Sequence, residues 1–294
     1  MARFTHVLCP VDFSDISQHA LDHAAAIAHR DHARLTVLYV FANLQVMDVP
    51  PLVLSPAERE RIRADLQRMC AGVPPGVSLD VRILEAERVD RTILAEQADL
   101  GADLLVLGTH GRSGFQHMML GSITEKVIRK ARCLTLVVPP RALDVSPTQP
   151  VRMTRLLCPM DFSGGSLNAF TWAKSLAEET GARLTVIAVV DIAYELRDSA
   201  LLANVDVDAI ARAAETATRR RLDALLANGA RTIDAVVATG SAPVTIVARA
   251  AQDSADLIVM GVHGRGAVDL RLFGSTTHRV IRSAPCPVLV IPPM

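Results

Sequence analysis

The sequence predicts an α/β protein with two similar domains, each built on a parallel β-sheet covered by helices. Composition is the first observation behind this prediction: half of the 294 residues are hydrophobic, but only 3% are aromatic. The core must therefore be built from Val, Leu, Ile and Ala, which suits buried parallel strands and Ala-rich helices. The other two observations are an internal repeat and a regular alternation of strand-like and helical patterns.

The chain carries one sequence pattern twice. Val7-Leu-Cys-Pro-Val-Asp-Phe-Ser14 returns as Leu156-Leu-Cys-Pro-Met-Asp-Phe-Ser163, shifted by 149 residues. Gly108-Thr-His-Gly-Arg112 returns as Gly261-Val-His-Gly-Arg265, shifted by 153 residues, so a few residues are inserted within the second copy. A period of about 150 residues is the size of a domain. We therefore expect a first domain at residues 1–141, a linker at 142–152 and a second domain at 153–294.

Apolar runs and helical periodicity alternate within each copy. Continuous apolar runs such as Leu104–Leu107 suit strands that are buried on both faces. Helical spacing after the first strand predicts a helix that begins at Ser14 or Ser17, and further helices are expected at about 55–71, 89–100 and 121–131. Successive β–α units form right-handed crossovers and a parallel sheet. The predicted strands lie at about 5–11, 34–41, 77–84, 103–108 and 133–138, then at 154–160, 183–190, 231–238, 256–261 and 286–291.

Charge and hydropathy argue against several classes of partner. Lys plus Arg equal Asp plus Glu at 31 each, so no net charge attracts polyanions, and we expect neither a nucleic acid nor a membrane as partner. No apolar run approaches the roughly 20 residues of a membrane helix, and no signal peptide is visible. We expect a cytoplasmic protein whose five cysteines are reduced and act as small hydrophobic residues.

A glycine-rich loop follows the fourth predicted strand of each copy. Its spacing is Gly-x2-Gly-x9-Gly-Ser in both. Glycines allow a phosphate to approach main-chain amides, and the following helix N-terminus attracts anions. Arginine at the fifth position of each loop could add charge-assisted contacts. The alternative is that these glycines only form tight turns. The loop residues are Gly108, His110, Gly111, Arg112, Gly121 and Ser122 in the first copy, and Gly261, His263, Gly264, Arg265, Gly274 and Ser275 in the second.

Two details of these loops and strand ends lead to further expectations. Ser122 and Glu125 have the Ser-x-x-Glu spacing of a capping box, which His278 breaks in the second copy. Asp12 and Asp161 follow the first strand of each copy, where a carboxylate could accept from ribose or adenine donors. The alternative for these carboxylates is a helix N-cap or an Asx turn.

The chain resembles the universal stress protein family in three features. These are the Asp-Phe-Ser strand ends, the two glycine loops, and the endings Cys133–Pro140 and Cys286–Pro293. The resemblance covers nearly the whole chain, twice over. It implies two tandem Rossmann-like domains of the adenine nucleotide alpha hydrolase-like type, each with five parallel strands in the order 3-2-1-4-5. It also implies that the final strands pair, either within one chain, at 134–138 and 288–291, or across a homodimer.

The resemblance further implies ATP or a related adenine nucleotide in each half, with or without Mg²⁺. By motif matching, Pro10, Asp12 and Val40 would lie near adenine and ribose, while Gly108, Gly111, Gly121 and Ser122 would hold the phosphates. No catalytic residue and no metal-ligand set is expected. The second-half equivalents are Pro159, Asp161, Val189, Gly261, Gly264, Gly274 and Ser275.

These expectations favour an ATP-binding stress-response regulator with little or no turnover. The alternatives are an ATP-using enzyme of the same fold, such as a slow ATPase or a pyrophosphatase, and a structural interaction module that binds no nucleotide. Because Gly164 and Gly165 would loosen the loop after Asp161, and because His278 breaks the capping box, we also expect tighter binding in the first half than in the second.

Overall fold

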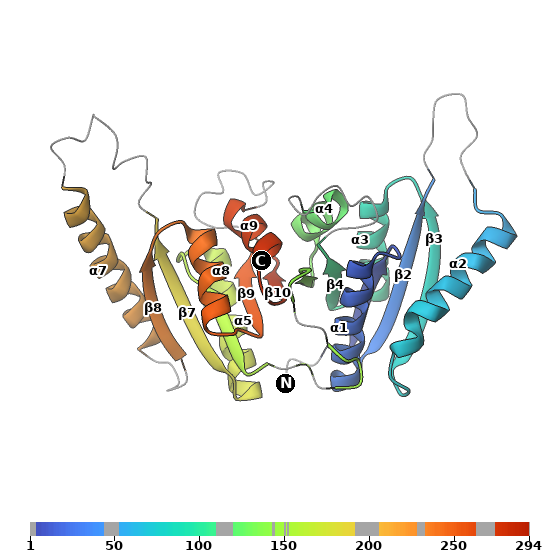
Figure 1. The fold of residues 1–294 in the computed structure, drawn as a ribbon, viewed down its shortest axis with the longest axis horizontal. Helices are drawn as coiled ribbons and strands as arrows, with labels where there is room; N and C mark the ends of the chain where they lie inside the picture. The colour runs from blue at the N-terminus through green and yellow to red at the C-terminus, as the bar shows by residue number, and fades with distance from the viewer. Residues whose placement is uncertain are drawn as a thin grey trace, which may run out of the picture. The chain divides into compact units, whose positions relative to one another are not determined.

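Strands and helices alternate along the chain in the computed structural model (Figure 1), as the sequence predicts. The chain divides into two compact units, of which the first ends at residue 152 and the second begins at residue 153. The structure describes residues 4–43, 53–109, 120–142, 145–149, 151, 153–191, 206–227, 233–262 and 274–293.

In the first unit, five parallel strands have the order β3-β2-β1-β4-β5. This order confirms the one implied by the family resemblance. Helix α1 packs on β1 and β4, and α3 packs beside α4. The elements are β1 (His6–Val11), α1 (Asp15–Asp31), β2 (Arg34–Ala42), α2 (Pro56–Met69), the short 3₁₀ helix η1 (Cys70–Gly72), β3 (Ser78–Ala86), α3 (Val89–Leu100), β4 (Leu104–Gly108), α4 (Ser122–Lys130) and β5 (Leu134–Val138).

The second unit repeats this sheet as β8-β7-β6-β9-β10, again with all strands parallel. Helix α5 packs on β6 and β9, as α1 does in the first unit. The elements are β6 (Arg155–Pro159), α5 (Gly164–Thr180), β7 (Arg183–Val190), α7 (Val207–Leu226), β8 (Ile233–Thr239), α8 (Ala242–Gln252), β9 (Leu257–Gly261), α9 (Ser275–Ser283) and β10 (Val288–Ile291).

Four of the five cysteines are buried in the apolar core, as predicted, and Cys133 is partly exposed. Cys9 on β1 and Cys158 on β6 are fully buried, and Cys70 and Cys286 are also buried. Burial raises the pKa of the Cys158 thiol to about 12 and that of Cys70 to about 11. All five cysteines are free thiols. Thiols with such a raised pKa stay protonated at neutral pH, so they pack as small hydrophobic side chains.

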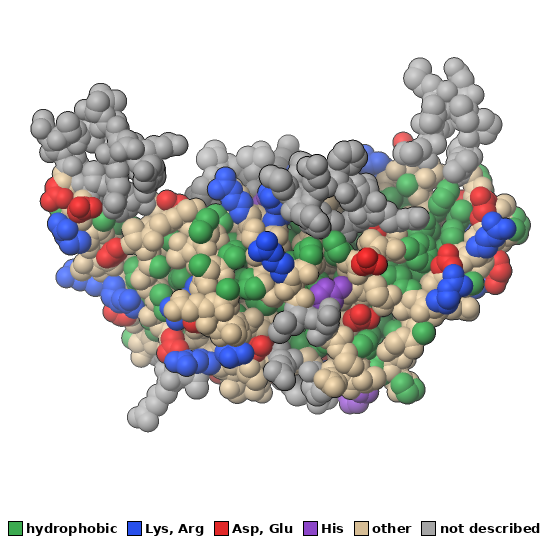
Figure 2. Space-filling view, in the orientation of Figure 1, with side chains coloured by type: hydrophobic (Ala, Val, Ile, Leu, Met, Phe, Trp, Pro, Cys, Tyr) green, Lys and Arg blue, Asp and Glu red, His purple; other side chains and the backbone are tan. Residues whose placement is uncertain are grey.

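Charges of both signs mix on the outer helices. Glu60 and Arg63 pair at 3.4 Å on α2, and Asp206 lies 3.7 Å from Arg212 at the start of α7. Figure 2 shows acidic and basic side chains next to one another over these helices. Exposed pairs of this kind contribute little stability and create no field of a single sign. Among the described residues, no helix combines the length and apolar character that crossing a bilayer requires.

Strand β5 carries a buried hydroxyl group. Thr135 is 1% exposed, and its Oγ1 has no hydrogen-bond partner among the described residues. Thr135 lies opposite Leu105 in the ladder, and the matching place in the second unit, opposite Ile258, is taken by the fully buried Val288. A buried hydroxyl without a partner costs roughly 1–3 kcal/mol. The second unit therefore has the more favourable side chain at this position.

The last residues of β4 and β9 are glycines that lie directly against the first helix of their unit. A Cβ atom at Gly108 would lie 2.6 Å from Ile16 Cγ2, and one at Gly261 would lie 2.8 Å from the carbonyl carbon and oxygen of Gly165. Ile16 and Gly165 are matching residues in the first turns of α1 and α5. These two glycines are therefore required by helix packing, whatever they do for a ligand.

Replacing Thr135 by Val is expected to raise the free energy of unfolding by about 1 kcal/mol, because the isosteric methyl group needs no hydrogen bond. Urea unfolding followed by circular dichroism measures the change. The reciprocal Val288→Thr substitution is the matched control and should lower the same quantity. A Thr135→Val protein less stable than the wild type would contradict the prediction.

Gly261→Ala is expected to destabilise the protein by about 1–3 kcal/mol, and more than Gly108→Ala. At Gly261 the three nearest atoms all belong to the backbone of Gly165, at 2.8 to 3.0 Å, whereas at Gly108 the backbone atoms of Ile16 lie farther away, at 3.1 and 3.3 Å, and only its Cγ2 methyl is closer. Urea midpoints of the two variants test the order. Gly164→Ala is the control, because nothing lies within 4 Å of its added Cβ. A larger loss from Gly108→Ala would refute this account.

Candidate functional site

In the first unit β1 and β4 are parallel neighbours that pair at Val7–Leu104 and Leu8–Leu105, and β6 and β9 pair at the matching residues of the second unit, so the carboxyl ends of each pair face the same edge of the sheet. At these places the chain order reverses, because the chain runs from β1 to β2 and β3 on one side and then crosses to β4 and β5 on the other, as it does from β6 in the second unit. In open α/β sheets, such switch points are where ligands bind. The sequence-predicted site residues can bind one ligand only if they lie together along this edge.

The residues predicted to contact adenine and ribose lie near the carboxyl ends of their strands. Pro10 pairs with Leu38 late in β1, and Val40 is close to the end of β2. Both are half-buried. In the second unit, Pro159 is the last residue of β6 and is buried, and Val189 lies near the end of β7. Each unit thus brings its predicted residues to one edge of its sheet.

Asp12 forms an Asx turn at this edge. Its Oδ1 accepts hydrogen bonds from the Ser14 amide at 3.1 Å and the Ser14 hydroxyl at 2.6 Å, and the Asp161 Oδ1 accepts the same pair from Ser163 at 3.0 and 2.6 Å. Ser14 and Ser163 in turn cap helices α1 and α5. The Asx-turn interpretation is therefore confirmed, and the contact of these carboxylates with a ligand stays a prediction.

The residue after each aspartate has a left-handed backbone. Phe13 has a φ angle of 65° and Phe162 one of 61°. Bulky residues rarely adopt this conformation, which costs of order 1–3 kcal/mol, and such strain clusters at functional sites. The ring of Phe13 lies 4.9 Å from that of Tyr39, whereas the guanidinium of Arg221 lies 4.0 Å above the ring of Phe162. Local sequence patterns do not predict a left-handed residue here, although the repeated Asp-Phe-Ser marks its position in both units.

The capping box predicted at Ser122 and Glu125 is wrong. The N-cap of α4 is Gly121, without a side-chain cap, and Ser122 is already the first helical residue. The Glu125 amide donates to the Gly121 carbonyl at 2.9 Å as an ordinary helical bond, and the His278 amide does the same with Gly274. His278 therefore removes no cap from α9. Both helices have a glycine as N-cap, so within the part of the chain that the structure describes no N-cap side chain bonds their first-turn amides.

Gly164 and Gly165 do not loosen a loop, because they form the first turn of α5. Gly165 packs against Gly261, and Ser163 caps the helix with its hydroxyl 3.2 Å from the Ser166 amide. Both grounds for expecting weaker binding in the second half are therefore lost. The geometry of the described residues ranks neither site above the other.

The two ends of the first glycine loop are tied together. The Gly121 amide donates to the Thr109 carbonyl at 2.8 Å, and the Thr124 hydroxyl donates to the Gly108 carbonyl at 2.9 Å. In the second unit the Gly274 amide donates to the Val262 carbonyl at 3.2 Å. The strand end thus holds the helix N-terminus next to the switch point. The predicted residues His110, Gly111, Arg112, His263, Gly264 and Arg265 lie outside the described residues.

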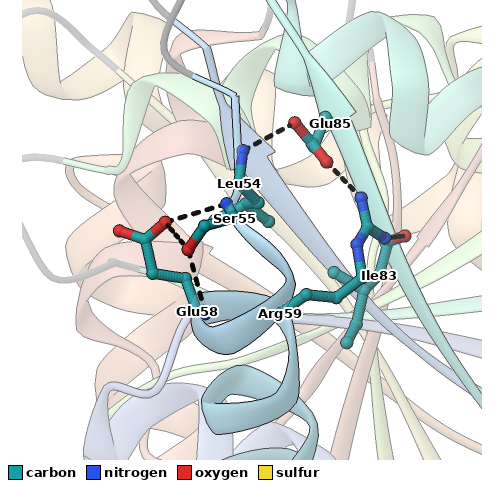
Figure 3. A network of polar contacts seen from close by, with 6 residues as sticks. All are labelled: Leu54, Ser55, Glu58, Arg59, Ile83 and Glu85. Atoms are coloured by element: carbon teal, nitrogen blue, oxygen red, sulfur yellow. Dashed lines mark hydrogen bonds and ion pairs between the residues drawn. The ribbon is translucent and has the colours of Figure 1, made fainter.

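A polar network holds helix α2 to the carboxyl end of β3 (Figure 3). Glu85 forms an ion pair with Arg59 and accepts a hydrogen bond from the Leu54 amide at 3.1 Å. Ser55 and Glu58 form a complete capping box at the start of the helix. The Ser55 hydrogen bonds lower the pKa of the Glu58 carboxyl. The network therefore holds the start of α2 against the carboxyl end of β3, the outermost strand of the first unit's sheet.

The second unit ties the corresponding helix to its sheet with different chemistry. In the middle of α7, Glu215 accepts a hydrogen bond from the Thr239 hydroxyl at the end of β8. Arg219 of the same helix also donates to the Ala235 carbonyl of β8 at 3.0 Å, so the second unit uses an acidic and a basic side chain where Arg59 of α2 bonds both Glu85 and the Ile83 carbonyl. Within the described ranges, no group of three or more His, Cys, Asp or Glu side chains could hold a metal ion.

Comparison with solved structures supports the fold. A universal stress protein from Archaeoglobus fulgidus superimposes with a TM-score of 0.65 at 20% identity, covering 98% of both chains. A Pseudomonas aeruginosa protein gives the same TM-score at 18% identity, covering 99% of this chain and 94% of its own. Likeness at this level of identity shows the tandem α/β architecture alone.

Sequence comparison identifies the family. A universal stress protein of Methanocaldococcus jannaschii is 33% identical over 147 residues, which cover 46% of this chain and 82% of the relative. One from Mycobacterium tuberculosis H37Rv is 26% identical over 295 residues, which cover 97% of this chain and 96% of the relative. The pattern of the Universal stress protein family matches residues 3–139 and again 153–292. The chain therefore belongs to the universal stress protein family and carries two of its domains in tandem.

Proposed function

We propose that each unit binds ATP at the carboxyl edge of its sheet, and that the protein is a nucleotide-dependent regulator of a stress response with little or no turnover. One observation carries this proposal. In both units, a helix N-terminus without a side-chain cap is hydrogen-bonded to the end of the strand that borders the Asp-Phe-Ser turn. Uncapped first-turn amides at a switch point are suited to phosphate groups.

The remaining groups along the edge fit the rest of a nucleotide. Pro10 and Val40 offer apolar, half-buried surface for an adenine ring, and Asp12 offers a carboxylate for ribose hydroxyls. Mg²⁺ bound with ATP takes one or two carboxylates and phosphate oxygens. Asp12 and Asp161 could each supply one such carboxylate. A cytoplasmic location and pairing of the final strands, within the chain or across a homodimer, remain predictions.

Calorimetric titration with ATP is expected to give two sites in the wild type, one in Gly121→Val or Gly274→Val, and none in the double variant. A β-branched side chain at the N-cap would shield the first-turn amides from the phosphates. Thr135→Val, whose substitution lies in a buried strand, is the control and should keep both sites.

A wild-type protein that neither retains a nucleotide during purification nor responds to added ATP would refute the proposal and favour a structural module. Mass spectrometry of the denatured, purified protein identifies any retained nucleotide. Multiple turnover of ATP to AMP and pyrophosphate would instead favour the enzymatic alternative.

A further inference from the structure

Each unit contains a buried threonine that links the helix after the glycine loop to the strand before it. Thr124 on α4 donates from Oγ1 to the carbonyl of Gly108 at 2.9 Å, and Thr277 on α9 donates to the carbonyl of Gly261 at 3.0 Å. Thr124 is 8% exposed and Thr277 is 3% exposed. The two bonds join corresponding atoms of the two units, and each spans 16 positions along its own sequence.

The threonine bond acts together with the main-chain bond at the same place. Gly121 is the N-cap of α4, so Thr124 is the third helical residue and lies one turn from the Gly121 amide that bonds the Thr109 carbonyl. Two bonds about one helical turn apart fix the rotation of the helix as well as its distance from the strand. In a helix Thr has two common χ1 rotamers, one of which turns the hydroxyl back to its own helix, and the bond to the strand carbonyl holds the side chain in one of them.

Each threonine uses its only donor hydrogen for the bond to the strand carbonyl. The Thr124 hydroxyl points back to the strand end and does not cap the helix. Its burial keeps it away from a ligand on the open edge of the sheet. The hydroxyl can therefore affect a ligand only through the placement of the amides that precede it, those of Ser122 and Ile123.

We propose that Thr124 and Thr277 are positioning residues, which hold the first-turn amides of α4 and α9 in the orientation that binds the phosphates of ATP. This inference rests on the proposed function. Preorganised donors gain affinity because less ordering is left to be done when the ligand binds. The gain is confined to the phosphate end of the ligand, since the adenine and ribose contacts come from other strands.

The test uses the full chain with the double substitution Thr124→Val/Thr277→Val and titrates it with ATP and, separately, with adenosine. ATP affinity is expected to fall by about fivefold to tenfold per site, the equivalent of one lost hydrogen bond, while adenosine affinity stays the same. Thr124→Ser/Thr277→Ser keeps both hydroxyls and should restore ATP binding. Thr135→Val removes a buried hydroxyl that takes part in neither of these two hydrogen bonds, and it should leave both affinities unchanged.

Two results would overturn the inference in a protein that binds ATP. One is an ATP affinity of the double Val variant within about twofold of the wild type. The other is an equal loss for ATP and adenosine, which would indicate general loosening of the unit.

If the wild type binds no ATP, the proposed function fails while the positioning role stays testable by amide hydrogen exchange. The double Val variant should then exchange the amides of Gly121 and Gly274, which are hydrogen-bonded to the strand ends beside each tie, faster than Thr135→Val does, because local opening becomes easier when a tie is lost. Equal exchange in the two variants would refute the positioning role.

Discussion

The pairing of β1 with β4 is the constraint on which each unit depends, because it creates the switch point. The pair is held at both ends. At the amino end, the Asp103 carboxylate accepts from the Thr5 amide at 2.8 Å, the Thr5 hydroxyl at 2.7 Å and the His6 amide at 3.1 Å. At the carboxyl end, Gly108 lets α1 pack directly on the strand. In the second unit the Asp256 carboxylate accepts hydrogen bonds from Thr154 and Arg155, and Gly261 lets α5 pack directly on β9.

The sequence predicts the parts of this arrangement that depend on local patterns. Strands expected at 103–108 and 133–138 are found as Leu104–Gly108 and Leu134–Val138, because continuous apolar runs between turn residues are strong signals. The sequence also predicts a helix start at Ser14 or Ser17, and the structure has Ser14 as the N-cap of α1. The capping box predicted at Ser122 and Glu125 does not form, because the N-cap of α4 is Gly121, one residue earlier than the predicted Ser122. The same spacing at Ser55 and Glu58 does form the box.

Other features of the site could not be predicted, because they arise only when distant segments meet. The bond from Thr124 to Gly108 depends on where α4 packs against the sheet, and nothing near either residue specifies it. The left-handed φ of Phe13 runs against the steric preference of its residue type, so local propensity predicts the opposite. Tertiary packing has to stabilise that conformation, and the Tyr39 ring beside Phe13 supplies part of this packing.

The two units separate what the site requires from what can vary. The Asx turn, the left-handed phenylalanine and the threonine tie are present in both units with nearly the same distances. The surroundings differ: the contact from Tyr39 to Phe13 is replaced by the cation of Arg221 above Phe162. A feature that served only to stabilise one unit would be free to change as the surroundings did. The shared set all lies at the ends of two adjacent strands, where an anion would meet helix amides, and the variable set lies around it. This division is the pattern expected if both units bind the same kind of ligand and differ in how its binding is coupled to the rest of the protein.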